Sequence, residues 1–392
     1  MFPTPCYYYD TALLERTLAA VGSHLSRHPQ WHMHYAVKAN AVPELLHLIS
    51  RAGFGADCVS GGEVRLAAAS GFAPSQIFYA GVGKADWEID LALGTGIGCF
   101  NVESAEELRI ISQRAEALGT TAPVAMRVNP DIGAHTHANI TTGLAENKFG
   151  INLEQLPAVL TEALRLPAIR YCGLHFHIGS QILDMADFVA LCNRIDQLSR
   201  ELRTSGLPVG DINVGGGLGV DYQHPDEAPM ADFDAYFDVF HRHLPLAPDQ
   251  QLHFELGRSI VAPCGTLVTR LLYVKEGTTR RFAIVDGSMT ELIRPALYHA
   301  YHHPQNISSL IESVRGEATR PTQVYDLVGP VCESSDVFAR AITLPTCRRG
   351  DIIALRTAGA YGQSMSSTYN ARPLPAAVCA PMPLADYLQQ SK

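Results

Sequence analysis

The stretch MHYAVKANAV, residues 33–42, joins a short apolar run to a lysine and an asparagine. An apolar run of this length is typical of a buried strand. An open sheet that binds a dinucleotide places the fingerprint GxGxxG directly after its first strand. Because the sequence reads VKANAV at that point, the stretch disfavours a dinucleotide-binding sheet and favours a different arrangement of strands and helices.

Short apolar runs alternate with longer amphipathic stretches from Trp31 to Arg258. The short runs predict strands at 33–38, 56–59, 77–80, 98–102, 124–128, 171–177, 212–214 and 252–255. The stretches between them predict helices at 43–52, 63–69, 105–118, 156–164, 188–202 and 233–243, the second and third preceded by Ser60 and Ser104 with capping-box spacing. Alternation through eight strands over a span close to the ~250 residues of such domains predicts a (β/α)₈ barrel of the TIM type, with an open doubly wound sheet as the alternative.

The character of the sequence changes after Pro263. Strand-like segments at 266–274, 282–285, 324–328 and 352–356 are separated by turn residues, and one helix is predicted at 290–301. A strand-like run at 6–9 precedes the barrel and is expected to pair with this second region. The predicted domains are therefore an N-terminal segment 1–25 that pairs with the β domain, a barrel 26–262, and a C-terminal β-rich domain 263–392.

Composition excludes several classes of protein. The 392 residues carry a formal net charge of −9, whereas nucleic-acid-binding proteins usually show a basic surplus or stripe. Hydrophobic residues make up 47% and charged residues 18%, which argues against disorder. No apolar run reaches the ~18 residues of a membrane helix, and the first ten residues lack the pattern of a signal peptide. Nine scattered cysteines without metal-ligand spacing predict neither disulfides nor a metal site, and they fit a reducing cytoplasm.

Polar residues stand at the predicted carboxyl ends of the strands, where barrel enzymes carry their chemistry. They are Lys38, Asp57, Asn101, Arg127, His175, His177, the glycines of GGGLG from 215 onward, Glu255 and Arg258. Because the first and last strands of a closed barrel are neighbours, we expect Lys38 and Glu255 to face the same mouth.

Each of these groups allows an ordinary and a chemical interpretation. Lys38 is either a surface residue or a Schiff-base amine, and GGGLG is either a tight turn or a phosphate-binding loop. Glu255 pairs either with Arg258 or with a protonated ring nitrogen, while the two histidines are core residues, a flat partner for a ring or, least favoured, a metal pair. Taken together, the chemical interpretations match what pyridoxal 5′-phosphate (PLP) requires, which makes that cofactor a hypothesis.

At ten motifs, spread over nearly the whole chain, the sequence resembles the fold-type III PLP-dependent decarboxylases, and among them the diaminopimelate decarboxylases. The motifs are YAVKAN, GADCVSGGE, MRVNP, ENKFGI, GLHFHIGSQI, NVGGGLG, ELGRSIVAPCG, MTELIRPALYHAYH, VGPVCESSDVFA and GAYGQSMSSTYNARP, in this order from residue 35 to residue 373. Single motifs are weak signals, but ten in the same order are specific. The chain departs from the usual pattern at Leu256, where relatives commonly have proline, and in the stretch VDGSMTELIRP.

The resemblance implies roles for individual residues. Lys38 would form the Schiff base with PLP, His177 would stack on its ring, Glu255 would pair with its ring nitrogen, and Cys332 would return a proton to the substrate. The cofactor would be held by Lys38, Asp57, His177, Ser180, Gly216, Gly217, Glu255, Leu256, Gly257, Arg258 and Tyr361, with Glu63 and Arg127 in a supporting polar network. The substrate would be bound by Arg258, Arg294, Tyr298, Glu333 and Tyr361.

The resemblance further implies decarboxylation of meso-2,6-diaminopimelate to L-lysine and CO₂, the last step of lysine biosynthesis, by a head-to-tail homodimer with shared active sites. Two arginines suit the far carboxylate of diaminopimelate, and Glu333 suits its ammonium. The alternatives are a decarboxylase of the same build acting on ornithine, lysine or arginine, an alanine-racemase-like enzyme, an aldolase barrel, and an inactive relative that binds a partner. Glu255 argues against the racemase, and the presence of both Lys38 and Cys332 argues against the inactive relative.

Overall fold

The computed structural model describes residues 2–132, 148–317 and 319–390. The chain divides into two compact units. The barrel unit consists of Leu18–Gly219 and Asp232–Gly257, and the β-rich unit consists of Met1–Thr17, Val220–Ala231 and Arg258–Lys392. The barrel was predicted at 26–262, whereas the barrel unit ends at Gly257 and the segment Val220–Ala231 belongs to the other unit.

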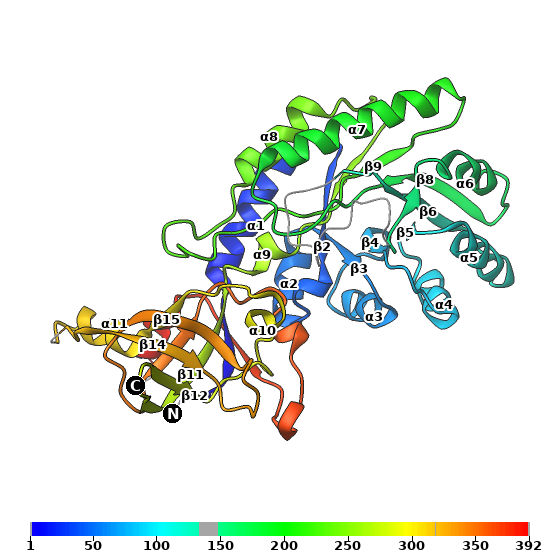
Figure 1. The fold of residues 1–392 in the computed structure, drawn as a ribbon. Coiled ribbons are helices and arrows are strands. Elements are labelled where there is room, and N and C mark those ends of the chain that lie inside the picture. Colours follow the sequence, from blue (N-terminus) through cyan, green and yellow to red (C-terminus); the bar gives the residue numbers. More distant parts are fainter. Residues whose placement is uncertain (1, 133–147, 318, 391–392) are drawn as a thin grey trace. The chain divides into compact units, whose positions relative to one another are not determined.

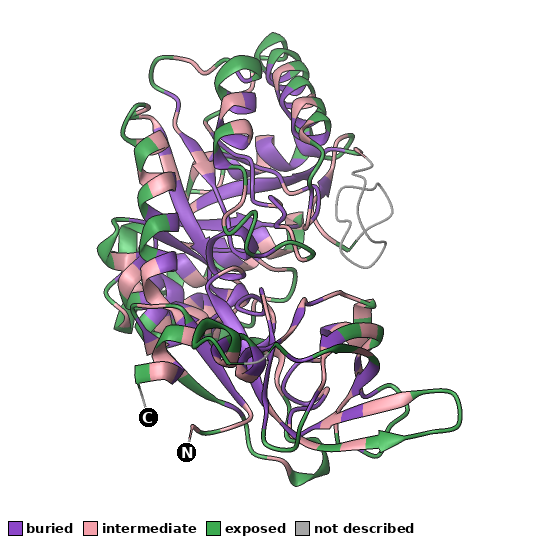
Figure 2. Cartoon of the chain, turned by 90° about the vertical axis from the view of Figure 1, so that its left-hand side faces the viewer, coloured by how far each residue is buried: buried purple, intermediate pink, exposed green. Residues whose placement is uncertain are grey.

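The barrel unit contains a closed ring of eight parallel strands, as predicted (Figure 1). In order around the ring these are β2 (Trp31–Ala36), β3 (Gly55–Cys58), β4 (Ile77–Tyr79), β5 (Cys99–Val102), β6 (Ala122–Asn129), β8 (Ile169–His175), β9 (Asp211–Asn213) and β10 (Leu252–Phe254). The short β7 (Ile151–Asn152) pairs with the carboxyl end of β6. Pairing of Phe254 with Met33 joins β10 to β2 and closes the ring. The strands are largely buried (Figure 2), which explains why they read as continuous apolar runs.

Helices cover the outside of the ring (Figure 1). They are α2 (Pro43–Arg51), α3 (Gly61–Ala69), α4 (Asp86–Thr95), α5 (Ala105–Ala117), α6 (Leu156–Ala163), α7 (Met185–Thr204) and α8 (Phe233–His243). Ser60 and Ser104 cap α3 and α5, each accepting a hydrogen bond of 3.2 Å from the backbone N–H three residues later. These caps place the start of α3 at Gly61, two residues before the predicted start. The described residues contain no helix that is both long and apolar enough to cross a membrane.

The β-rich unit is built around a mixed sheet that the N-terminal strand joins. The sheet order is β13–β16–β11–β12–β14–β15, and β1 pairs with both β11 and β17. The bounds are β1 (Cys6–Asp10), β11 (Gly265–Glu276), β12 (Arg281–Val285), β13 (Pro304–Asn306), β14 (Thr322–Val328), β15 (Val337–Pro345), β16 (Ile352–Leu355) and β17 (Ala376–Ala380). The prediction that the N-terminal strand pairs with the β-rich region is confirmed, with Tyr7 opposite Leu267 and Ala377.

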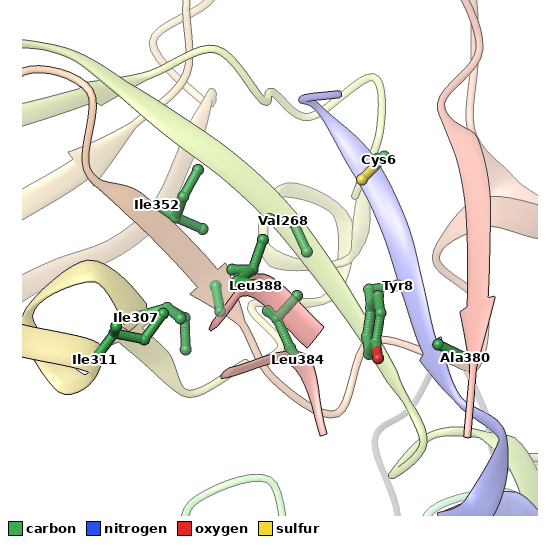
Figure 3. Packing of buried hydrophobic residues seen from close by; sticks show 10 residues of the cluster. Cys6, Tyr8, Val268, Ile307, Ile311, Ile352, Ala380, Leu384 and Leu388 are labelled. Atoms are coloured by element: carbon green, nitrogen blue, oxygen red, sulfur yellow. The ribbon is translucent and has the colours of Figure 1, made fainter. Parts of the chain in front are cut away.

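Alternation along β1 explains how this strand is buried on both faces. Cys6 and Tyr8 point into a core formed with residues of β11, β16, α11 (Ile307–Val314) and α12 (Leu384–Gln390), as Figure 3 shows. Tyr7 and Tyr9 lie on the opposite face with their rings stacked. This single strand therefore packs on core residues that are separated from it by hundreds of positions in the chain.

The prediction of a single helix at 290–301 in this region is wrong. The helix there, α10, spans only Arg294–Tyr298, because Pro295 suits a first turn and His299 adopts a left-handed φ of 53° that ends the helix. The unit also contains α9 (Arg258–Val261), α11 and α12. Asn306 caps α11 by accepting a hydrogen bond from the N–H of Ser309, a signal that was present in the sequence. The remaining helix, α1 (Thr11–Leu25), contains the boundary between the two units.

Candidate active site

Lys38 lies directly after the first barrel strand. β2 ends at Ala36, two residues before the predicted strand end, and Lys38 occupies a single 3₁₀ turn, Val37–Ala39. Its side chain is 38% exposed, and its Nζ lies 3.2 Å from Oδ2 of the buried Asp57. Asp57 stands on β3 opposite Ala36. The parallel pairing of two neighbouring strands therefore brings this lysine and this carboxylate together at the carboxyl end of the barrel.

The surroundings of Asp57 destabilise the charged form of its carboxylate. Burial raises its pKa to about 7, repulsion from Glu255 adds to this, and the attraction of Lys38 opposes it. Its second oxygen, Oδ1, has no hydrogen-bond partner among the described residues. A buried carboxylate oxygen without a donor costs free energy, so this side of Asp57 is suited to a donor or cation that the described residues do not supply.

Glu255 follows β10 and is held by three donors within the barrel unit. Its Oε1 accepts hydrogen bonds from Asn213 Nδ2 at 2.7 Å and Asn101 Nδ2 at 3.2 Å, and its Oε2 lies 2.9 Å from His175 Nε2. Burial alone would raise the pKa of Glu255, but His175, Lys38 and Asn213 outweigh it and hold the pKa below its usual range. Glu255 is therefore ionised. It follows β10, which pairs with β2, the strand before Lys38, and the charge of Lys38 contributes to the lowered pKa of Glu255.

The two histidines of GLHFHIGSQ have different surroundings. The predicted strand 171–177 contains both histidines, but β8 ends at His175, so His177 lies beyond the end of the strand. His175 is buried against Glu255, and its Nδ1 has no hydrogen-bond partner among the described residues. His177 accepts a hydrogen bond of 3.4 Å from the N–H of Gly216. Burial, Arg127 and Lys38 lower the pKa of His177 well below its usual value, so its ring is neutral.

The loop GGGLG requires its glycines. Gly215 and Gly217 have positive φ values of 69° and 112°. A Cβ on Gly216 would lie 2.1 Å from the carbonyl oxygen of Glu255. The loop thus packs backbone to backbone against the end of β10, as a tight turn and a phosphate-binding loop both demand. Gly257 is confined in the same way, because a Cβ there would meet the Cβ atoms of Ala36 and Ala39 at 2.9 and 3.0 Å.

The expected supporting network of Asp57, Glu63 and Arg127 is divided in the structure. Asp57 contacts Lys38, whereas Glu63 Oε2 accepts the N–H of Val59 at 2.8 Å. Arg127 pairs with Glu103 at 2.8 Å, and both are buried. Glu103 was not predicted, although it directly follows β5 and so stands at the carboxyl end of a barrel strand, like the residues that were predicted. Ser180 lies partly exposed in the loop after β8, and Leu256 is buried just after β10.

A second cluster of predicted residues lies entirely within the β-rich unit. Arg258 and Arg294 are 5% and 6% exposed, so Arg294 is not the solvated surface charge that an isolated helix residue suggests. Arg258 Nη1 donates to the hydroxyl of Tyr222 at 2.7 Å, and Arg294 donates to His302 Nε2 at 3.2 Å and more weakly to Tyr222. The Arg258 guanidinium lies over the ring of Tyr361, and that of Arg294 lies near the ring of Tyr298.

Two members of this cluster, Tyr222 and His302, were not predicted. His302 must accept from Arg294 through Nε2, because its Nδ1 faces the carbonyl oxygen of Arg356 at 3.3 Å. Burial and then Arg294 lower the pKa of His302 to about 3, so it is neutral. Among the described residues, the hydrogen-bond partners of Arg294 are thus both uncharged. Tyr222 comes from Val220–Ala231, the segment that follows the glycine loop in the chain but belongs to the β-rich unit.

Cys332 and Glu333 lie in the exposed loop between β14 and β15. Glu333 Oε1 accepts a hydrogen bond of 2.9 Å from the hydroxyl of Tyr369. All nine cysteines of the chain, Cys332 included, are free thiols. Of the motif ENKFGI, residues 146 and 147 lie outside the described residues, while Lys148 and Phe149 are placed, with Arg127 over the ring of Phe149.

The residues around Lys38 fit PLP. The cofactor needs an amine, an anion-binding loop and a carboxylate for its ring nitrogen. The barrel unit provides Lys38 beside Asp57, whose Oδ1 has no hydrogen-bond partner among the described residues. It also provides a loop whose backbone requires glycines and an ionised Glu255. Among the described residues, three of the five buried side-chain atoms without a hydrogen-bond partner belong to residues that contact Lys38 or Glu255, namely Asp57 Oδ1, His175 Nδ1 and Asn101 Oδ1. The donor set therefore agrees with that cofactor.

Comparisons with known proteins agree with this chemistry. Residues 12–262 match the family model described as the pyridoxal-binding domain of pyridoxal-dependent decarboxylases. The diaminopimelate decarboxylase of Bacteroides thetaiotaomicron is 55% identical over 95% of this chain and 94% of its own length. The crystal structure of the Helicobacter pylori enzyme complexed with L-lysine has a TM-score of 0.88 at 36% identity, covering 97% of this chain and 92% of that one. That of the M. jannaschii enzyme has a TM-score of 0.86 at 33% identity, covering 96% and 87%.

The family model matches most of the chain, and one relative is more than half identical along nearly all of it. Both findings agree with the chemistry of the residues at the carboxyl end of the barrel. The chain therefore belongs to the diaminopimelate decarboxylases, a family of pyridoxal-dependent decarboxylases.

Proposed function

We propose that the chain decarboxylates meso-2,6-diaminopimelate to L-lysine and CO₂. The observation that carries the choice of substrate is Arg294, a buried cation whose hydrogen-bond partners among the described residues, Tyr222 and His302, are neutral. A buried charge favours an ionic partner. Diaminopimelate has a carboxylate at its far end, and the diamine-forming substrates ornithine and lysine have none. The names of the relatives and the lysine bound in the Helicobacter pylori structure support the same substrate.

PLP would be held in the barrel unit by Lys38, His177, Glu255, Ser180 and the loop that contains Gly216 and Gly217, with Asp57, Leu256 and Gly257 assisting. When bound, the cofactor withdraws the electron pair that the departing carboxylate leaves behind. Glu255 would keep the ring nitrogen protonated, since it is ionised and fixed by three donors. His177 would present a neutral, flat imidazole, and Lys38 an amine held beside Asp57.

The residues of the β-rich unit would act on the substrate. Arg258 and Arg294 would bind the distal carboxylate through charge-assisted hydrogen bonds, with Tyr298 and Tyr361 beside them. Glu333 would accept the distal ammonium. Cys332 would donate a proton to the α-carbon after CO₂ leaves, because it is an exposed free thiol and a positioned thiol can act as a general acid.

Two further parts of the proposal concern assembly and location. A head-to-tail homodimer would let the loop of Cys332 and Glu333 serve the site of the partner, which accounts for the exposure of both residues. A reducing cytoplasm is supported by the nine free thiols, most of them buried.

The test compares CO₂ release from meso-diaminopimelate, ornithine and lysine by the purified PLP-loaded enzyme. We expect release from diaminopimelate to exceed that from the other two by on the order of 10³-fold in kcat/KM, since ornithine and lysine have no distal carboxylate for the buried guanidinium of Arg294. A preference for ornithine would instead assign the chain to the other decarboxylases of this build and remove the proposed role of Arg294.

A further inference from the structure

The loop that carries Cys332 and Glu333 is tightly built. It spans residues 329–336 between β14 and β15. The N–H of Glu333 donates to the carbonyl oxygen of Val331 at 2.8 Å, and the N–H of Asp336 donates to that of Glu333 at 3.0 Å. The N–H of Gly329 closes the loop at its base by donating to the carbonyl oxygen of Asp336 at 3.1 Å. Two exposed side chains of the proposed chemistry are thus displayed on a folded loop.

Asp336 anchors this loop from beneath. It is 3% exposed, and its two carboxylate oxygens accept separate backbone hydrogen bonds. Oδ2 accepts the N–H of Val331, the residue before Cys332, at 2.8 Å. Oδ1 accepts the N–H of Met289 at 2.7 Å. Hydrogen bonds of this length to an ionised oxygen are among the stronger ones in proteins, so the carboxylate fixes the backbone on which Cys332 stands.

The second bond of Asp336 reaches the segment that leads to Arg294. Met289 lies in a turn that Glu291 stabilises, since Glu291 Oε2 accepts the N–H of Ser288 at 2.7 Å. The N–H of Leu292 donates to the carbonyl oxygen of Ser288 at 3.1 Å, and α10 begins at Arg294. A single carboxylate therefore connects the loop of Cys332 and Glu333 to the segment that positions Arg294.

Gly329 gives independent evidence that the carboxylate has a fixed place. A Cβ on Gly329 would lie 2.3 Å from Oδ2 and 2.6 Å from Oδ1 of Asp336. No Cβ approaches an oxygen so closely, so any larger residue at 329 would displace the carboxylate. The backbone of the first loop residue and the side chain of the last are fitted to each other.

We propose that Asp336 is a positioning residue for the reaction, which holds Cys332 where its thiol can deliver the proton and fixes the spacing between Cys332, Glu333 and the Arg294 segment. The inference rests on the proposed function, which assigns the proton transfer to Cys332. Asp336 does not touch the substrate in this account; it acts through the two backbone N–H groups.

A purely structural role for Asp336 is the competing interpretation, and Asp326 is the matched control. Asp326 is also buried, stands on β14 of the same hairpin, and accepts the N–H of Ala341 at 2.7 Å. It differs in lying on the strand rather than under the loop, and in pairing with Arg280 Nη1 at 3.1 Å. If Asp336 only stabilises the hairpin, then Asp336→Asn and Asp326→Asn should have the same consequences.

The experiment uses the PLP-loaded enzyme and Asp336→Asn, in which the amide oxygen can replace one acceptor while the NH₂ group cannot replace the other. We expect kcat for meso-diaminopimelate to fall by about 10-fold to 100-fold, the cost of a small misplacement of a reacting group. The rate at which iodoacetamide alkylates Cys332, followed by mass spectrometry of its peptide, should differ from wild type. Asp326→Asn should keep the wild-type kcat and alkylation rate, whatever its melting temperature.

A double-mutant cycle with Cys332→Ala decides whether the effect passes through the thiol. If it does, Cys332→Ala/Asp336→Asn should be no slower than Cys332→Ala alone. Multiplying effects, or an Asp336→Asn enzyme that matches Asp326→Asn in every readout, would overturn the proposal. Full activity of Cys332→Ala would instead overturn the proposed role of Cys332 itself. If Asp336→Asn does not fold, Gly329→Ala displaces the same carboxylate and should give the same slow turnover.

Discussion

Glu255 in the barrel unit and Arg294 in the β-rich unit are both buried charges, and their surroundings differ in kind. Glu255 receives hydrogen bonds from Asn101, Asn213 and His175, so both of its oxygens are occupied from within the chain. Arg294 has two hydrogen-bond partners among the described residues, Tyr222 and His302, and burial lowers its pKa without neutralising it. A guanidinium keeps its charge in any protein environment.

The difference shows what each unit is built to do. The donors around Glu255 fix one carboxylate in one ionisation state, which suits a permanent cofactor. The neutral aromatic and imidazole groups around Arg294 orient the cation and leave its charge uncompensated, which suits an anion that binds and leaves at each turnover.

Replacing Lys38 with Ala should have the largest effect, because it removes the only amine beside Asp57 among the described residues. We expect CO₂ release from meso-diaminopimelate to fall on the order of 10³-fold or more, as for loss of a residue that bonds covalently. Mass spectrometry after borohydride reduction should find a pyridoxyl group on Lys38 of the wild type and none on the variant. A variant that still shows a reduced pyridoxyl group at another lysine would contradict the assignment of Lys38.

Replacing Glu255 with Gln should reduce kcat by on the order of 10²-fold to 10³-fold, since an amide cannot hold the charge of a ring nitrogen. The same variant also tests whether Asn101, Asn213 and His175 keep Glu255 ionised in the folded protein. A lowered pKa means that the folded state binds this proton less tightly than the unfolded state, so Glu255 stabilises the fold above its ordinary pKa of ~4.3 and loses this contribution as the pH falls below it.

The stability measurement compares urea unfolding of wild type and Glu255→Gln between pH 4 and pH 7. We expect the difference in the free energy of unfolding between the two proteins to be constant near neutral pH and to become smaller towards pH 4. A gap that widens as the pH falls would mean that Glu255 is protonated in the folded protein. The three donors would then have a different purpose from the one inferred from their geometry.

Replacing Arg294 with Met should raise KM for meso-diaminopimelate more than it lowers kcat, because the distal carboxylate is bound in both the ground and the transition state. Loss of a charge-assisted hydrogen-bond pair corresponds to about 10-fold to 100-fold in kcat/KM. Arg315→Met, an exposed arginine after α11 in the same unit, is the control and should behave as wild type. Equal effects of both substitutions would show that Arg294 is not special to the substrate.

Much of the barrel and of its mouth could be predicted because closure follows from local signals. Eight short apolar runs mark the strands, and parallel strands in a ring bring Lys38, Asp57 and Glu255 to one end without any knowledge of their contacts. The predictions were wrong where the partner of a side chain depends on tertiary packing. Arg127 was assigned to a network with Asp57 and Glu63, but its partner is Glu103, and only the packing of the neighbouring strands distinguishes these carboxylates.

The arginine cluster was harder to predict for a different reason. Apart from Arg258, which follows the last predicted barrel strand, its predicted members were known only from the resemblance. Tyr222 and His302 were missed because no periodicity connects them to Arg258 or Arg294. Tyr222 reaches the cluster through Val220–Ala231, a segment that leaves the barrel unit for the β-rich unit between two barrel strands. Short helices such as α11 and α12 were also missed, because two turns hold too few residues to show a helical period.

Replacing Asp57 with Asn should have the smallest effect, on stability in the absence of the cofactor. The pKa of Asp57 is raised to about 7, so the folded protein holds this proton more tightly than the unfolded chain does. Stability from this group is then fully present below its ordinary pKa of ~3.9 and is lost as the pH rises through about 7. The amide that replaces the carboxyl group in the variant does not titrate and would have no such pH dependence.

The melting temperatures of wild type and Asp57→Asn should therefore diverge as the pH rises from 4.5 to 8 in the cofactor-free protein, in favour of the variant. A few degrees are expected, since ~1 kcal/mol corresponds to roughly 2–4 °C in a domain of this size. Saturating PLP should reduce the difference, because a bound group that supplies a donor to Oδ1 removes the penalty of the charge. A difference that stays constant with pH would mean that Lys38 already compensates Asp57, and the barrel cluster would then be as complete at Asp57 as it is at Glu255.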